Sequence, residues 1–109
     1  MLALLGRIVG KALAEAVIEE YKIEKNDLEG LKTALEKVLP KLMQFEATLE
    51  EGKLKTRSNC PIYKKYREWC DEGCIPLIES FAKSINPKIN VKRTMKETGR
   101  CEFEFSINL

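Results

Sequence analysis

The stretch FEATLEEGKLKTRS, residues 45–58, decides the fold class because its hydrophobic spacing is alternating, whereas the residues before it follow helical spacing. Within it, apolar or small residues alternate with charged or polar ones, and the first set comprises Phe45, Ala47, Leu49, Leu54, Thr56 and Ser58. Glu51 and Gly52 separate the two runs, as in a tight turn. The stretch therefore predicts a β-hairpin with one face exposed to solvent.

Two amphipathic helices are predicted before this hairpin. Asn26 offers an N-cap for the second helix, and Asp27 and Glu29 then fall in a first turn, where acidic side chains suit the helix dipole. Pro40 is expected to end or kink this helix near Leu39. The first helix, from about residue 2 to 21, is predicted to be apolar on one broad face formed by Leu5, Ile8, Val9, Ala12, Leu13, Ala16, Val17 and Tyr21.

A third helix is predicted after the hairpin. Ser58 or Asn59 can cap it, and Pro61 lies close to the preferred first-turn position. A kink or short break is expected between Gly73 and Pro76, because proline removes an amide donor and crowds the carbonyl four residues before it. The dipeptide at residues 86–87, Asn-Pro, should end this helix.

A second hairpin completes the chain. Its first strand is expected around residues 89–95 and its turn at residues 97–99, while its second strand places Cys101, Phe103, Phe105 and Ile107 on one apolar face. The predicted order is α-α-β-β-α-β-β. Strands that come in hairpins, together with helices that cover one face, predict a single α+β domain over residues 1–109, built on an antiparallel four-stranded sheet.

Composition narrows the classes of function. The chain has 109 residues, of which 44% are hydrophobic and 33% charged, with a net charge of only +2 and no basic cluster, so we expect no nucleic-acid binding. The apolar start, residues 1–5, is too short for a membrane span or a signal peptide, so a cytoplasmic location is expected. The absence of histidine excludes histidine-based catalysis and mixed Cys/His zinc sites.

All four cysteines lie in the second half of the chain, at Cys60, Cys70, Cys74 and Cys101. Cys70 and Cys74 are one helical turn apart, and Cys101 shares a strand face with Phe103, so these three thiols can converge. Cys60 would lie about 15 Å from Cys70 along a continuous helix, which makes a four-thiolate site awkward.

Three interpretations of the cysteines stay open: buried structural thiols, a metal site with zinc or iron as candidate metals, and a disulfide or redox pair. The spacing lacks the paired C-x2-C of a zinc ribbon. Nearby aromatic residues are either core or the lining of a small-molecule site, and the candidate ligand-binding residues are Tyr66, Trp69 and Phe103.

The second half also resembles a known pattern. Asn59-Cys60-Pro61, then Cys70, then Gly73-Cys74, and finally Gly99-x-Cys101-x-Phe103 are similar to the 4-vinyl reductase domain family and the related L-2-amino-thiazoline-4-carboxylate hydrolase-like family, over residues 45 to 107. The resemblance implies an α+β fold shared with ligand-binding domains of nitric-oxide signalling and Golgi-tethering proteins, dimerisation through helices, and family cysteines suspected of metal binding.

The leading hypothesis is therefore a small-molecule- or metal-binding module with a cysteine-lined site, acting as a homodimer. An alternative is a cysteine-dependent hydrolase or thiol redox protein, with Cys60 or Cys74 as a nucleophile activated by lysine or arginine. A third is a structural protein that binds another chain through its first helix, since Leu2, Leu4, Leu5, Ile8 and Val9 are more apolar than a solvated helix face needs.

Overall fold

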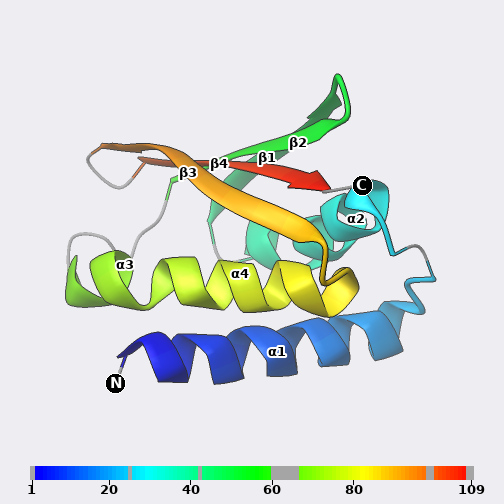
Figure 1. Cartoon of the computed structure of the whole chain (residues 1–109), viewed down its shortest axis with the longest axis horizontal. Helices are drawn as coiled ribbons and strands as arrows, with labels where there is room; N and C mark the ends of the chain where they lie inside the picture. Colours follow the sequence, from blue (N-terminus) through cyan, green and yellow to red (C-terminus); the bar gives the residue numbers. More distant parts are fainter. Residues whose placement is uncertain (1, 25, 42, 60–66, 98–99, 108–109) are drawn as a thin grey trace.

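The computed structural model describes residues 2–24, 26–41, 43–59, 67–97 and 100–107, and at residues 67, 70–71, 94–97 and 100 it describes the backbone alone. The order of elements confirms the predicted α+β fold (Figure 1). The elements are α1 (Leu2–Tyr21), α2 (Leu28–Val38), the 3-10 turn η1 (Leu39–Lys41), β1 (Gln44–Glu50), β2 (Lys53–Asn59), α3 (Arg67–Glu72), α4 (Cys74–Ile85), β3 (Ile89–Glu97) and β4 (Arg100–Ile107).

The four strands form one antiparallel sheet in the order β1-β2-β4-β3. In the β1–β2 turn, Glu51 and Gly52 both have positive φ, at 50° and 75°, which is the backbone conformation of the tightest hairpin turns. The two hairpins are joined through their second strands, where Thr56 pairs with Phe103 and Ser58 pairs with Cys101. This register brings the predicted inward faces of both hairpins onto the same side of the sheet.

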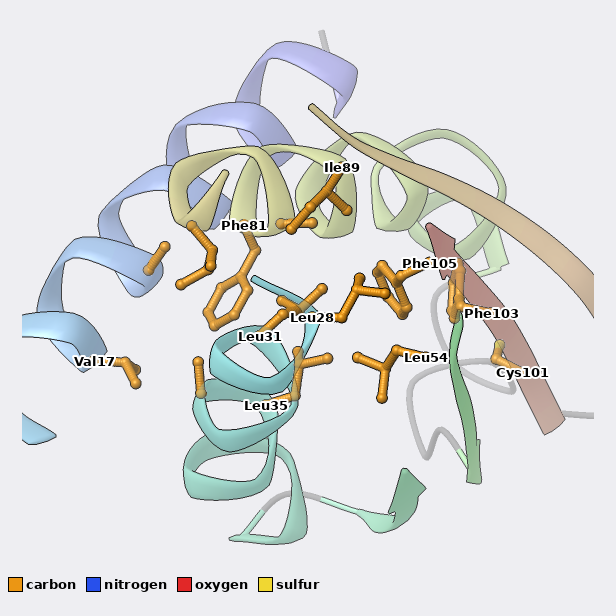
Figure 2. Close-up of a cluster of buried hydrophobic side chains, with 14 residues drawn as sticks. Val17, Leu28, Leu31, Leu35, Leu54, Phe81, Ile89, Cys101, Phe103 and Phe105 are labelled. Atoms are coloured by element: carbon orange, nitrogen blue, oxygen red, sulfur yellow. The ribbon is translucent and has the colours of Figure 1, made fainter. Parts of the chain in front are cut away.

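The molecule has three layers (Figure 1). Helices α2 and α4 cover one face of the sheet, and α1 lies along α4 on the side away from the strands. The core fills the space between the sheet and the first helical layer. Figure 2 shows Phe105 and Leu54 from the strands meeting Leu31 and Leu35 of α2 and Phe81 of α4, each at most 3% exposed.

The predicted interruption of the third helix is confirmed, and it lies at Gly73, between α3 and α4. The amide of Gly73 donates to the carbonyl of Trp69 at 2.8 Å, so the last turn of α3 is closed before the chain changes direction. A Cβ at Gly73 would overlap the ring of Trp69, which explains why glycine occupies this position. Pro76 lies in the first turn of α4, where a helix needs no amide donor.

The apolar face expected for α1 is buried only in part. The residues of α1 that are buried are Gly6, Gly10, Ala14 and Val17, whereas Leu5 and Ile8 are 47% and 58% exposed. The reason is the close approach of α1 to α4: a Cβ at Gly10 would overlap the carbonyl oxygen of Leu77. Small residues therefore face α4, while Leu4, Leu5 and Ile8 in the first half of α1 face outward.

The predicted cap of α2 also needs a correction of one residue. The N-cap is Asp27, not Asn26, and its Oδ1 accepts a hydrogen bond of 3.0 Å from the amide of Gly30. Pro40 lies in η1 directly after α2, as predicted. None of the helices described is long and apolar enough to cross a membrane.

Candidate functional site

A cavity of about 160 Å³ lies between the sheet and the helices. Its described lining comes from both hairpins and from all four α-helices, and most of it is aliphatic or aromatic. The residues that bear on its chemistry are Thr56, Ser58, Trp69, Cys74, Cys101 and Phe103. Three of these, Thr56, Cys101 and Phe103, are at most 6% exposed, so the cavity reaches into the core.

The sheet side of the cavity is built by the central strand pair β2–β4. Alternation along β4 turns Cys101, Phe103 and Phe105 toward the helices, as the sequence predicted. The antiparallel register sets Ser58 beside Cys101 and Thr56 beside Phe103. Two hydroxyls, one thiol and two aromatic rings therefore share one wall.

The helical side of the cavity is built around the turn at Gly73. Trp69 precedes this turn in α3, and Cys74 is the first residue of α4. Both residues line the cavity, followed one turn later by Leu77 and Ile78. Cys74 and Cys101 are thiols that line the same cavity from opposite layers, although they are 27 residues apart in sequence.

The other predicted site residues are placed differently. Tyr66 and Cys60 lie outside the described residues, and Cys70 is described by its backbone alone, in α3. Within the described part of the chain, no group of three or more His, Cys, Asp or Glu side chains could hold a metal ion. The metal site with zinc or iron therefore stays a prediction.

Sequence reasoning missed the hydroxyls of Thr56 and Ser58 as site groups. Thr56 is the buried polar residue of the described core, at 6% exposure. Neither hydroxyl forms a hydrogen bond with any group in the described ranges. The signal was available, because both residues take the inward positions of β2 in alternation with Lys53, Lys55 and Arg57.

The ion pairs of the β2–β4 strand pair lie on the opposite face of the sheet, whereas Arg93 of β3 pairs with Phe103 and its guanidinium carbon lies 5.5 Å from the centre of the Phe103 ring. Lys53 bonds Glu104 at 2.9 Å and Arg57 bonds Glu102 at 3.1 Å across the β2–β4 pair. The lysine contact raises the pKa of Lys53 and lowers the pKa of Glu104, mainly through this hydrogen bond. Apart from the two thiols, the cavity lining that the structure describes has no ionisable side chain, so the cavity suits a neutral molecule.

A second hollow, of about 740 Å³, lies along η1 and the start of β1. It is open to solvent, and its described lining runs through consecutive surface residues of one chain segment, including Lys41, Gln44 and Glu46. Since this hollow lacks converging groups from different elements, the cavity between the sheet and the helices is the stronger candidate site.

Comparison with known proteins adds no assignment: no family model, no curated protein and no solved structure matches this chain.

Proposed function

We propose that this protein binds a small, neutral and mostly apolar molecule in the cavity between its sheet and helices. One observation carries the proposal: a largely apolar cavity in which the polar groups of the described lining residues are two hydroxyls, two thiols and the indole N–H of Trp69. Ligand sites commonly combine such an apolar lining with a few polar groups that orient the ligand. Trp69 and Phe103, both expected from the sequence to contact a ligand, lie on this lining.

The volume indicates the size of the ligand. A dry cavity of about 150 Å³ lined by aliphatic and aromatic groups accepts benzene in an engineered protein. The cavity here, at about 160 Å³, therefore accommodates a single six-membered ring with one small substituent. A hydroxyl or carbonyl substituent would find a partner in Thr56 or Ser58, so we propose a phenol-like or comparable one-ring compound as the ligand class.

The binding test compares phenol with toluene, which has nearly the same shape and lacks the hydroxyl. Both are expected to raise the thermal midpoint, and phenol should bind more tightly by calorimetry. Thr56→Val keeps the shape of the side chain and removes the hydroxyl, so it should weaken phenol about 2- to 13-fold if Thr56 is the partner and leave toluene unchanged. Thr48→Val, at an exposed position of the neighbouring strand, is the matched control.

Failure of both compounds to bind, with no midpoint shift at millimolar concentration, would contradict the proposal. Equal affinity for phenol and toluene would instead show that the hydroxyls of Thr56 and Ser58 do not contribute to binding. A Thr56→Val protein with unchanged phenol affinity would move the contact to Ser58, for which Ser58→Ala is the corresponding variant.

A second candidate function is the binding of zinc or iron through Cys70, Cys74 and Cys101, with Cys60 as a further ligand. It is supported by the position of two of these thiols on one cavity, and by the resemblance of the cysteine pattern to the 4-vinyl reductase domain family. Protein purified without oxygen should then contain metal in a fixed ratio, which Cys101→Ala abolishes. Metal at background level in the wild-type protein would exclude this function.

A further inference from the structure

Strand β1 lies at an edge of the sheet. Within the described residues it pairs with β2 alone, and the register of this pairing is continuous over all seven of its residues. The other edge strand, β3, has a register shift between Arg93 and Met95. Such irregularities are one means by which proteins protect a sheet edge from further pairing. Of the two edges, β1 is therefore the one suited to receive another strand.

The two-residue turn between β1 and β2 fixes which backbone groups of β1 point outward. Glu50 and Lys53 close this turn as a hydrogen-bonded pair, and such pairs recur at every second residue of an antiparallel ladder. The amide and carbonyl groups of Phe45, Ala47 and Leu49 therefore point away from β2. None of the other backbone hydrogen bonds formed by the described residues involves these three residues. They form an edge to which a further strand can add.

The surroundings of β1 leave this edge open. The hollow along η1 lies against the first half of the strand, where Phe45 and Glu46 contribute to its lining. Figure 1 shows the turn between β1 and β2 projecting beyond the rest of the molecule, and Leu49, close to this turn, is 41% exposed. Both halves of β1 are therefore accessible from solvent.

The charges on the solvent face of the sheet indicate which kind of strand fits. Among the described side chains, their sign alternates from strand to strand: Glu46 and Glu50 on β1, Lys53, Lys55 and Arg57 on β2, Glu102 and Glu104 on β4, and Lys92 on β3. The acidic strand β4 thus lies between two basic strands. The side chains of Glu102 and Glu104 are only 20% and 25% exposed, with basic partners at 3.1 and 2.9 Å.

The acidic strand β1 has a basic strand on one side only. Glu50 is 62% exposed, and its contact with Lys55 is long, at 3.9 Å. Since opposite charges on neighbouring strands are stabilising, a basic strand at the outer edge would give Glu46 and Glu50 the surroundings that Glu102 and Glu104 already have. A second copy of β1 fits less well, because its antiparallel pairing would gather the acidic side chains of both copies on one face.

We propose that β1 binds an extended segment of a partner protein by strand addition, and that this segment alternates lysine or arginine with apolar or small residues. Its basic side chains lie on the solvent face, next to Glu46 and Glu50. Its other side chains lie on the helical side, next to Phe45, Ala47 and Leu49. Strand β2 has this same alternation and pairs with β1 at its other edge, so the chain itself contains one strand of the proposed kind.

The sequence of β2 supplies the probe. A fluorescein-labelled peptide KLKTRSN, the sequence of residues 53–59, should gain anisotropy when the wild-type protein is added, whereas a peptide with glutamate at its three basic positions should not. Glu46→Gln combined with Glu50→Gln should weaken binding about 5-fold, because two cross-strand charge pairs are lost. Glu19→Gln combined with Glu20→Gln is the matched control, since it changes the net charge equally but lies on α1, away from the sheet.

The backbone contact has its own measurement. Hydrogen exchange followed by NMR should show that the peptide slows exchange at the amides of Phe45, Ala47 and Leu49. Ala47→Pro removes one of these amides and no hydrogen bond of the β1–β2 ladder, so it should abolish binding in a protein that circular dichroism shows to be folded. Methylation of alternate peptide amides tests the same contact without altering the protein: one alternate set should abolish binding, and the other should leave it unchanged.

Unchanged anisotropy of the basic peptide at about 1 mM protein would overturn the proposal. Equal affinity for the acidic peptide would do the same, because the charges would then select nothing. Binding that leaves the three amides unprotected, or that survives Ala47→Pro, would place the peptide elsewhere on the molecule. Protection of these amides that grows with protein concentration in the absence of peptide would show that a second copy occupies the edge instead.

Discussion

Replacement of Gly10 by alanine tests how α1 is held against the rest of the protein. In the structure, a Cβ at this position would overlap the carbonyl oxygen of Leu77 and would lie 3.0 Å from its carbonyl carbon. These are main-chain atoms within α4, so they cannot move aside as a flexible side chain can. The added methyl group must therefore push α1 away from α4.

Two effects of opposite sign decide the magnitude. Alanine is favoured over glycine within a helix by about 1 kcal/mol. Forcing a methyl group into a closely packed contact typically costs about 1–3 kcal/mol, and a rigid neighbour places the cost at the upper end or beyond. The displaced helix also loses contacts elsewhere along its inner face. We therefore expect Gly10→Ala to lower the free energy of unfolding by about 2 kcal/mol, which lowers the thermal midpoint by about 8 °C in a domain of this size.

Chemical denaturation followed by circular dichroism, at one protein concentration, measures this loss. Ala16→Gly is the control, because Ala16 is exposed in the same helix and reports the intrinsic preference alone, at about 1 kcal/mol. Gly6→Ala should be destabilising for the same reason as Gly10→Ala. The double variant should lose less than the sum, since one displacement of α1 relieves both overlaps. Higher stability of Gly10→Ala than of wild type would refute the packing described for α1.

Three further outcomes follow from local contacts. Asp27→Ala should lower the free energy of unfolding by about 1 kcal/mol, because it removes the N-cap of α2. Asp27→Asn should lose much less stability, because asparagine also caps helices, and equal losses in the two variants would contradict the capping role. The pKa of Glu104 is lowered below 4.5 and that of Lys53 raised above 10.5, so their pairing contributes throughout the pH range between these values. The contribution of the pair is lost below that range as Glu104 is protonated and above it as Lys53 loses its proton. In the variant Lys53→Met, NMR titration should show the pKa of Glu104 returning toward its ordinary value. An unchanged pKa of Glu104 would contradict the pairing. Cys101, at 3% exposure, should react with a thiol reagent more slowly than the half-buried Cys74, as measured by mass mapping, and equal rates would show that the cavity opens readily.

The strands could be predicted from the sequence because a pattern in which apolar and polar residues alternate fits a strand with its apolar face toward the core. A one-residue shift of β4 would expose Cys101, Phe103 and Phe105 together, so the alternating pattern alone identifies the inward face. The turn at Gly52 and the break at Gly73 could be predicted for similar reasons, since glycine and proline act on the local backbone whatever the rest of the chain does.

The orientation of α1 could not be predicted from hydrophobicity. Leu4, Leu5 and Ile8 of its first half point outward, because the distance to α4 is set by glycines and not by the burial of large side chains. The spacing of Gly6, Gly10 and Ala14, four residues apart, was the available signal for close helix packing. The cavity was also beyond sequence reasoning, because its size depends on how side chains from distant segments fit together. The sequence did identify Cys74, Cys101, Trp69 and Phe103 of the cavity lining as candidate site residues.

The turn at Gly73, directly before α4, connects the packing of α1 with the cavity. Gly6 approaches the carbonyl of Gly73, while Gly73 itself packs under the ring of Trp69 and directly precedes Cys74. Trp69 and Cys74 both line the cavity. We therefore expect a displacement that begins at Gly6 to reach the cavity wall through Gly73.

This connection predicts that Gly6→Ala weakens phenol binding as well as stability. Asp27→Ala is the appropriate comparison, because it lowers stability at the start of α2, away from the Gly73 turn, and should leave phenol affinity within twofold of wild type. Calorimetry of both variants below their unfolding midpoints separates the two effects. Unchanged phenol affinity in Gly6→Ala, with the expected loss of stability, would show that the cavity wall does not follow α1.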